Sequence, residues 1–216
     1  MKKKLALLLF VLIGLTLVYF SGPKTAVTLE INSKLPDISL SLDEIEGHIN
    51  ERESAFELRK DNEARIIWAD SLRKTEWTIL YLHGFSASQG EGAPVHQNIA
   101  KALGANLLLA RLSGHGYQEQ QLSDFTANQA LADASYYLAL AQALGEKVLI
   151  MGTSTGCTYA LQLAAQFPNE VDALVNLSPN IRVKDPAAKL LNDPWGLEIA
   201  EIVIGPERRV VSDSIG

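Results

Sequence analysis

A strand, a tight glycine turn and a helix follow one another between residues 146 and 165, and this stretch constrains the fold most. The apolar residues 148–151 predict a buried strand, which breaks at the Gly-Thr-Ser-Thr-Gly sequence of residues 152–156. A helical pattern follows up to Phe167. Ser154 would stand at the apex of the turn, in a strained conformation that directs its hydroxyl away from the main chain.

The turn has the features of a site for acyl transfer. Gly152 and Gly156 lack side chains, so the helix can pass close to the strand that precedes it. The N-terminus of the helix directs free N–H groups and a partial positive charge at the space above Ser154. A nucleophile beside such amides is what acyl transfer requires. The Gly-x-Ser-x-Gly pattern alone also fits an ordinary glycine-rich turn. Its position between a strand and a helix, however, favours the catalytic interpretation.

Other strands and helices alternate around this stretch. Strands are predicted at residues 65–69, 77–82, 106–112 and 171–177, and helices at 94–103 and 124–144. The alternation predicts an α/β fold, with a mostly parallel sheet and helices on both faces. Residues 70–76 suit a hairpin loop between the first two of these strands.

The N-terminus predicts an association with a membrane. Three lysines precede an unbroken apolar run from Leu5 to Phe20, which as a helix would be about 24 Å long and could span a bilayer with its flanks. We expect a membrane anchor at residues 1–23, and the alternative is a secretory signal that is removed. The lysines would stay in the cytoplasm, so the domain would be anchored outside it, or secreted or periplasmic after cleavage.

Composition excludes several function classes. The net charge of −6 offers no basic stripe for a nucleic-acid partner. Cys157 is the only cysteine, so an intrachain disulfide is impossible, and its position on the helix favours a small core residue. Cysteine and histidine do not cluster with metal-ligand spacing, so neither a metal site nor a cofactor is expected.

Four sequence motifs, in matching order and spacing, resemble the α/β-hydrolase fold family, in particular its monoacylglycerol lipase-like and serine aminopeptidase-like branch. They are Leu-His-Gly-Phe at 82–85, Arg-Leu-Ser-Gly-His-Gly at 111–116, Gly-Thr-Ser-Thr-Gly at 152–156 and Ala-Leu-Val-Asn-Leu-Ser-Pro at 173–179. The resemblance implies that Ser154 is the nucleophile and that the N–H groups of Phe85 and Thr155 form the oxyanion hole. It also implies that His83 and His115 support loops through hydrogen bonds.

The residue pattern before residue 61 and the same resemblance after it set the expected domain boundaries. Residues 24–60 would be a linker and a surface helix, 61–179 the N-terminal part of the hydrolase core, and 180–216 the beginning of an apolar cap. In this family the acid and the histidine of the triad follow the nucleophile. All four histidines here precede Ser154, and no later acid is well placed. We expect a hydrolase cut within its cap; a natural inactive chain and an unusual triad with an upstream histidine are alternatives.

The predicted function is that of a serine hydrolase. Its substrates would be carboxylic esters of lipid or small acyl groups, and Ser154 would carry the acyl-enzyme. A peptidase or amidase of the same fold is an alternative, and the competing class is a binding protein that has lost the chemistry. An enzyme with a carboxylate nucleophile is disfavoured, because the turn carries serine.

Overall fold

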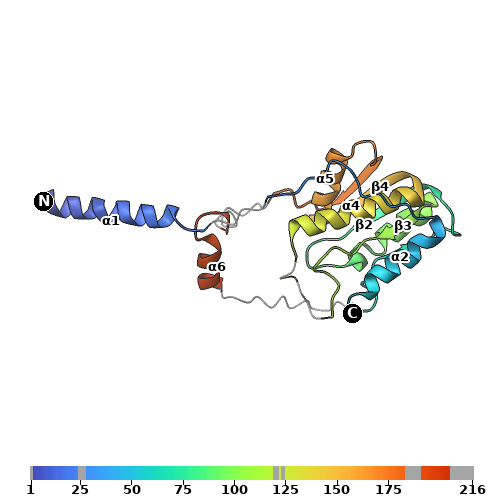
Figure 1. Cartoon of the computed structure of the whole chain (residues 1–216), viewed down its shortest axis with the longest axis horizontal. Coiled ribbons are helices and arrows are strands. Elements are labelled where there is room, and N and C mark those ends of the chain that lie inside the picture. Colours follow the sequence, from blue (N-terminus) through green and yellow to red (C-terminus); the bar gives the residue numbers. More distant parts are fainter. Residues whose placement is uncertain (1, 24–27, 119–121, 123–124, 183–190, 205–216) are drawn as a thin grey trace. The chain divides into compact units, whose positions relative to one another are not determined.

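The computed structural model describes residues 2–23, 28–118, 122, 125–182 and 191–204 (Figure 1). They belong to two compact units. The larger unit, Leu29–Ile181, contains the serine turn and every strand of the described residues. The smaller unit, Met1–Thr28 with Arg182–Gly216, contains the helices α1 (Lys2–Phe20) and α6 (Gly196–Ile204).

The larger unit is built on one five-stranded sheet in the order β1-β3-β2-β4-β5. The strands are β1 (Arg65–Ile67), β2 (Thr75–Leu82), β3 (Asn106–Leu109), β4 (Gly145–Thr153) and β5 (Ala173–Leu177). All neighbouring pairs are parallel except β1 with β3. The mostly parallel sheet predicted from the alternating pattern is therefore confirmed.

The prediction of a hairpin between β1 and β2 is wrong. β1 pairs antiparallel with β3, and Ile66 lies opposite Leu108. The side chain of Asn106, the first residue of β3, explains the arrangement. Its Oδ1 accepts from the N–H of Ala69 at 3.1 Å and its Nδ2 donates to the carbonyl of Arg73 at 2.8 Å. The segment after β1 is thus tied to β3 before the chain enters β2.

Helices cover both faces of the sheet, as the sequence predicts. They are α2 (Leu42–Ser54), α3 (Val95–Leu103), α4 (Ala127–Leu144) and α5 (Thr155–Gln166), with the short 3-10 helix η1 (Gln89–Gly92) before α3. Leu80 and Leu82 of β2 point to a core shared with α2, α4 and α5. Ile79 and Tyr81 point to the opposite face, where they pack with Ala100 of α3.

Helix α2 is part of the core of the larger unit, although the sequence placed it on the surface. Ile45 and Ile49 are fully buried. At its C-terminal end the carboxylate of Glu53 forms a buried bidentate ion pair with Arg111, at 2.6 and 3.0 Å. Periodicity alone could not show this, because the partner lies 58 residues further on. The boundary at residue 60 stays a prediction.

Helix α1 is the one helix within the described residues that is long and apolar enough to cross a membrane. Residues 3–20 have a mean hydropathy of 2.0 and none of them is buried. A signal sequence near an N-terminus has the same properties. In the same unit, Trp195 donates from its backbone N–H to the carbonyl of Pro23 at 3.1 Å and from Nε1 to that of Val18 at 3.0 Å. Of the predicted cap, 183–190 and 205–216 lie outside the described residues.

Candidate active site

Ser154 stands at the turn between β4 and α5 with a strained backbone. Its φ of 50° and ψ of −114° lie in a region that non-glycine residues rarely adopt. Three hydrogen bonds hold this conformation. The N–H of Ser154 donates to the carbonyl of Leu177 at 2.9 Å, and its own carbonyl accepts from the N–H groups of Cys157 and Asn180, each at 3.1 Å. The strain is maintained by β5 on one side and by α5 on the other.

The two glycines of the turn are required by close packing. A Cβ on Gly156 would lie 2.0 Å from the carbonyl oxygen of Leu82, the last residue of β2. A Cβ on Gly152 would lie 2.7 Å from the backbone nitrogen of Cys157. Helix α5 can therefore start directly against the end of β2. This contact brings Ser154 beside the loop that follows β2.

The loop after β2, residues 83–88, lies against the serine turn. A Cβ on Gly84 would lie 3.2 Å from Cβ of Ser154, so the two segments touch. The carbonyl of Gly84 accepts from Nδ1 of His83 at 2.9 Å and from the N–H of Ala87 at 3.3 Å. Because a trans peptide is planar, the N–H of Phe85 points away from these donors.

The N–H of Phe85 and that of Thr155 are the two donors expected for an oxyanion hole. Over the described part of the chain, no acceptor receives either of them. The N–H of Thr155 is also one of the free donors at the first turn of α5, where the helix dipole favours a negative charge. The site therefore offers two unpaired amides from separate segments near one hydroxyl.

His83 supports this loop, as the sequence predicts. Its side chain is fully buried, and burial lowers the pKa of the imidazole to about 3. It is therefore neutral at pH 7, with Nδ1 donating to Gly84 and Nε2 accepting from the N–H of Leu112 at 3.2 Å. Both nitrogens are committed to backbone groups, and neither is free to act as a base.

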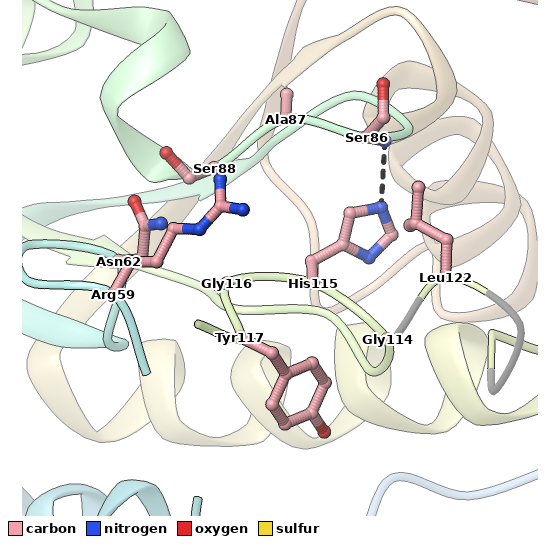
Figure 2. A pocket seen from close by; sticks show the side chains of 10 residues that line it. All are labelled: Arg59, Asn62, Ser86, Ala87, Ser88, Gly114, His115, Gly116, Tyr117 and Leu122. Carbon is pink, nitrogen blue, oxygen red and sulfur yellow. Dashed lines mark hydrogen bonds between the residues drawn. The ribbon is translucent and has the colours of Figure 1, made fainter. Parts of the chain in front are cut away.

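His115 has the same role on the other side of the loop. Figure 2 shows its Nε2 accepting from the N–H of Ser86, at 3.0 Å, and Nδ1 lies 2.9 Å from the carbonyl of Ser113. Burial lowers the pKa of this imidazole as well. The ring of Phe85 packs edge-on against His115 and Phe125, with centroids 5.7 and 5.3 Å apart. The side chain of Phe85 thus anchors the loop, while its amide remains free.

A polar cavity of about 190 Å³ lies between this loop and residues 114–117 (Figure 2). Arg59, Asn62, Ser88 and His115 are among the residues that line it. Ser154 and Thr155 are not among them. The cavity is therefore distinct from the space where a carbonyl would meet the serine.

The remaining histidines do not serve Ser154. His96 is fully buried, with Nε2 3.0 Å from the carbonyl of Gln89 and its ring against Tyr81. His48 is exposed on α2. The hydroxyl of Ser154 has no hydrogen-bond partner in the described residues. No histidine of this chain is therefore hydrogen-bonded to the candidate nucleophile.

Cys157 is a core residue, as expected. It is fully buried, and Sγ donates to the carbonyl of Gly152 at 3.0 Å. Among the acids that follow the serine, Asp172 accepts from the N–H of Val148 at 2.8 Å and so joins β4 to the segment before β5.

Groups of histidine, cysteine and acidic residues that could hold a metal ion do not occur among the described residues.

One residue near the serine was not anticipated from the sequence. The carboxylate of Glu91, in η1, accepts from the N–H of Gly84 at 2.8 Å. A glutamate seven residues after a glycine carries no recognisable pattern. Only the folded arrangement of η1 against the loop brings the two together.

Comparison with known proteins agrees with the fold. A family model described as alpha/beta hydrolase fold matches residues 78–199, more than half of the chain. Protein PHYLLO, chloroplastic, from Arabidopsis thaliana is 32% identical over 117 residues, which are 51% of this chain and 7% of that protein.

Two solved structures share the fold at low sequence identity. A lipolytic enzyme from a study of the metagenome-derived LipS and LipT has a TM-score of 0.55 and 21% identity over 62% of this chain and 53% of its own. Est1E from Butyrivibrio proteoclasticus, solved with ferulic acid, has a TM-score of 0.50 and 20% identity over 59% of this chain and 52% of its own. The chain spans about half the length of these structures.

Proposed function

The chain belongs to the α/β-hydrolase fold family, and on that premise we propose that it is a serine hydrolase that cleaves carboxylic esters through Ser154. The observation that carries the proposal is the strained backbone of Ser154, with φ of 50°, next to two unpaired amides. Strain of this kind persists only where the surrounding structure maintains it, and it is concentrated at functional sites. An ordinary β-to-α turn has no need of it.

In the proposed reaction, Oγ of Ser154 attacks the ester carbonyl carbon as its proton passes to a base. The carbonyl oxygen becomes an oxyanion, which accepts from the N–H groups of Phe85 and Thr155; one such donor is worth about 3 kcal/mol of barrier. The C–O bond to the alcohol then breaks and the alcohol leaves with a proton. Water attacks the acyl-enzyme, and the carboxylic acid departs as Ser154 regains its proton. None of the four histidines of this chain supplies the base.

The printed names of the two solved structures, a lipolytic enzyme and a protein with bound ferulic acid, favour an acyl substrate. We include lipid and small acyl esters in the proposed class. The proposed site needs no cofactor, because the serine and the amides supply the nucleophile and the charge stabilisation.

A fluorophosphonate probe tests the proposal directly. The full-length protein should react covalently with the probe, and Ser154→Ala should lose the labelling, with intact mass showing one adduct on the native chain. Ser71→Ala is the control, because Ser71 is exposed and its hydroxyl has no hydrogen-bond partner among the described residues. A native protein that folds and takes up no probe would contradict the proposed function.

We also propose that α1 attaches the protein to a membrane, with the hydrolase unit outside the cytoplasm. The support is the apolar stretch of residues 3–20 and the lysines that precede it. Extraction of membranes at alkaline pH should leave the protein in the pellet. N-terminal sequencing of the mature protein distinguishes an anchor, which keeps residues 1–23, from a secretory signal, which loses them.

A further inference from the structure

A carboxylate lies against the same glycine that touches the candidate nucleophile. A Cβ built on Gly84 would be 3.2 Å from Oε1 of Glu91 and 3.2 Å from Cβ of Ser154. Oε2 of Glu91 accepts from the N–H of Gly84 at 2.8 Å, and the hydroxyl of Tyr81 lies 3.5 Å away. Neither contact belongs to the proposed chemistry, in which Ser154, Phe85 and Thr155 act.

The hydrogen bond to Gly84 completes the fixation of the loop around Phe85. The carbonyl of Gly84 is held by His83 and Ala87, and the N–H of Ser86 is held by His115. Glycine has more backbone freedom than any other residue, so the peptide before Gly84 would otherwise be the least restrained. Glu91 binds the N–H of Gly84, while the N–H of the next residue, Phe85, has no acceptor among the described residues.

Glu91 is presented from a turn that is itself firmly held. Gln89 is buried, and its Nε2 donates to the carbonyl of Asp61 at 2.6 Å, while its own carbonyl lies 3.0 Å from Nε2 of His96. A Cβ on Gly92 would lie within 2.4 Å of the ring of His96, so the turn is packed tightly onto it. The carboxylate therefore has a defined place although its side chain is exposed.

We propose that Glu91 is a positioning residue for the oxyanion donor: through the N–H of Gly84 it sets the orientation of the Phe85 amide toward Ser154. The inference rests on the proposed serine hydrolase function. It assigns the effect to the hydrogen bond, not to the charge. A negative charge beside a developing oxyanion is unfavourable, so the charge of Glu91 cannot be what helps the reaction. A neutral hydrogen-bond acceptor at the same place should therefore orient the Phe85 amide equally well.

The test compares three variants of the full-length protein: Glu91→Ala, Glu91→Gln and the control Glu51→Ala, which alters an exposed glutamate of α2. The measurements are the rate of labelling by the fluorophosphonate probe and the values of kcat and KM for p-nitrophenyl butyrate. Glu91→Ala should lower the labelling rate and kcat about tenfold with KM within about twofold, because the loss falls on the transition state. Glu91→Gln and Glu51→Ala should stay within about threefold of the native protein.

A second measurement does not depend on catalysis. Hydrogen exchange of the Gly84 amide, followed by NMR, should be at least about tenfold faster in Glu91→Ala and unchanged in Glu51→Ala. Thermal unfolding of each variant shows that the chain is folded. This readout reports the hydrogen bond itself.

The outcomes separate the inference from the function on which it rests. If Ser154→Ala labels as fast as the native protein, the proposed function fails and the oxyanion role of Glu91 fails with it. If Ser154→Ala is silent and Glu91→Ala reacts at the native rate, only the inference is overturned. The inference is also overturned if hydrogen exchange of the Gly84 amide is unchanged in Glu91→Ala. It is overturned as well if the probe labels Glu91→Gln as slowly as Glu91→Ala, since the charge of Glu91 would then be responsible.

Discussion

The turn after β4 and the loop after β2 lie in contact, yet they are held in place by different means. The turn, residues 152–156, is maintained by backbone contacts: close glycine packing and three main-chain hydrogen bonds at Ser154. The loop, residues 83–88, is maintained by side chains, with His83, His115 and Glu91 each bonded to its backbone. The difference teaches that one half of the site depends on the absence of side chains, and the other on polar side chains that bind the backbone: two buried histidines and the exposed Glu91.

The largest expected effect concerns the turn. Gly156→Ala places a Cβ 2.0 Å from the carbonyl oxygen of Leu82, and neither backbone can give way easily. We expect the free energy of unfolding to fall by more than about 3 kcal/mol, as measured by urea titration. Gly47→Ala is the control, because a Cβ at that exposed helical position meets nothing within 4 Å and should stabilise by about 0.5–1 kcal/mol. If the two variants had similar free energies of unfolding, close packing at Gly156 would not be what maintains the turn.

The loop should respond to the loss of a buried imidazole. His83→Ala leaves the N–H of Leu112 without its acceptor and creates a cavity under the loop. We expect a loss of about 2–4 kcal/mol in the free energy of unfolding. A decrease of less than about 1 kcal/mol in the free energy of unfolding would mean that the backbone of the loop keeps its conformation without His83.

The loop, and not the turn, should make stability depend on pH. Burial lowers the pKa of His83 from its usual 6.5 to about 3, so the unfolded chain binds this proton more readily than the folded one. The contribution is complete above pH 6.5 and decreases by about 1.4 kcal/mol per pH unit as the pH falls toward 3. Urea titrations between pH 7 and pH 5 should show this slope, which adds to that of His115. In His83→Ala the slope should be smaller; an equal slope would contradict the assignment.

The smallest effect is expected where the two segments touch. Gly84→Ala places a methyl group 3.2 Å from Cβ of Ser154 and from Oε1 of Glu91. The free energy of unfolding should change by at most about 1 kcal/mol, whereas labelling by the fluorophosphonate probe should slow about tenfold. Loss of stability without slower labelling would show that this contact matters for folding alone.

What the sequence revealed about the site follows the same division. The turn could be predicted because strand, Gly-x-Ser-x-Gly and helix are contiguous, and glycine reports a local backbone requirement. The supporting role of His83 and His115 came from a resemblance to a family. Glu91 could not be found, because its contact with Gly84 depends on how η1 folds back. The burial of His96 against Tyr81 has the same cause.

The fold was likewise predictable where the pattern is local. The order of strands and helices follows from periodicity, and Gly104 ends α3 with a φ of 59°, in the left-handed conformation that glycine favours at helix ends. The partner of β1 did not follow, because pairing with β3 depends on the side chain of Asn106 and on the segment that it ties down.

The ion pair between Glu53 and Arg111 has a practical consequence for where this protein can be shortened. The family match begins at residue 78, which would invite removal of everything before it. Arg111 would then keep its guanidinium in the interior without a counterion, a change that typically costs about 3–5 kcal/mol. A shortened form of this chain must therefore retain the helix from Leu42 to Ser54, because that helix supplies the carboxylate that pairs with Arg111.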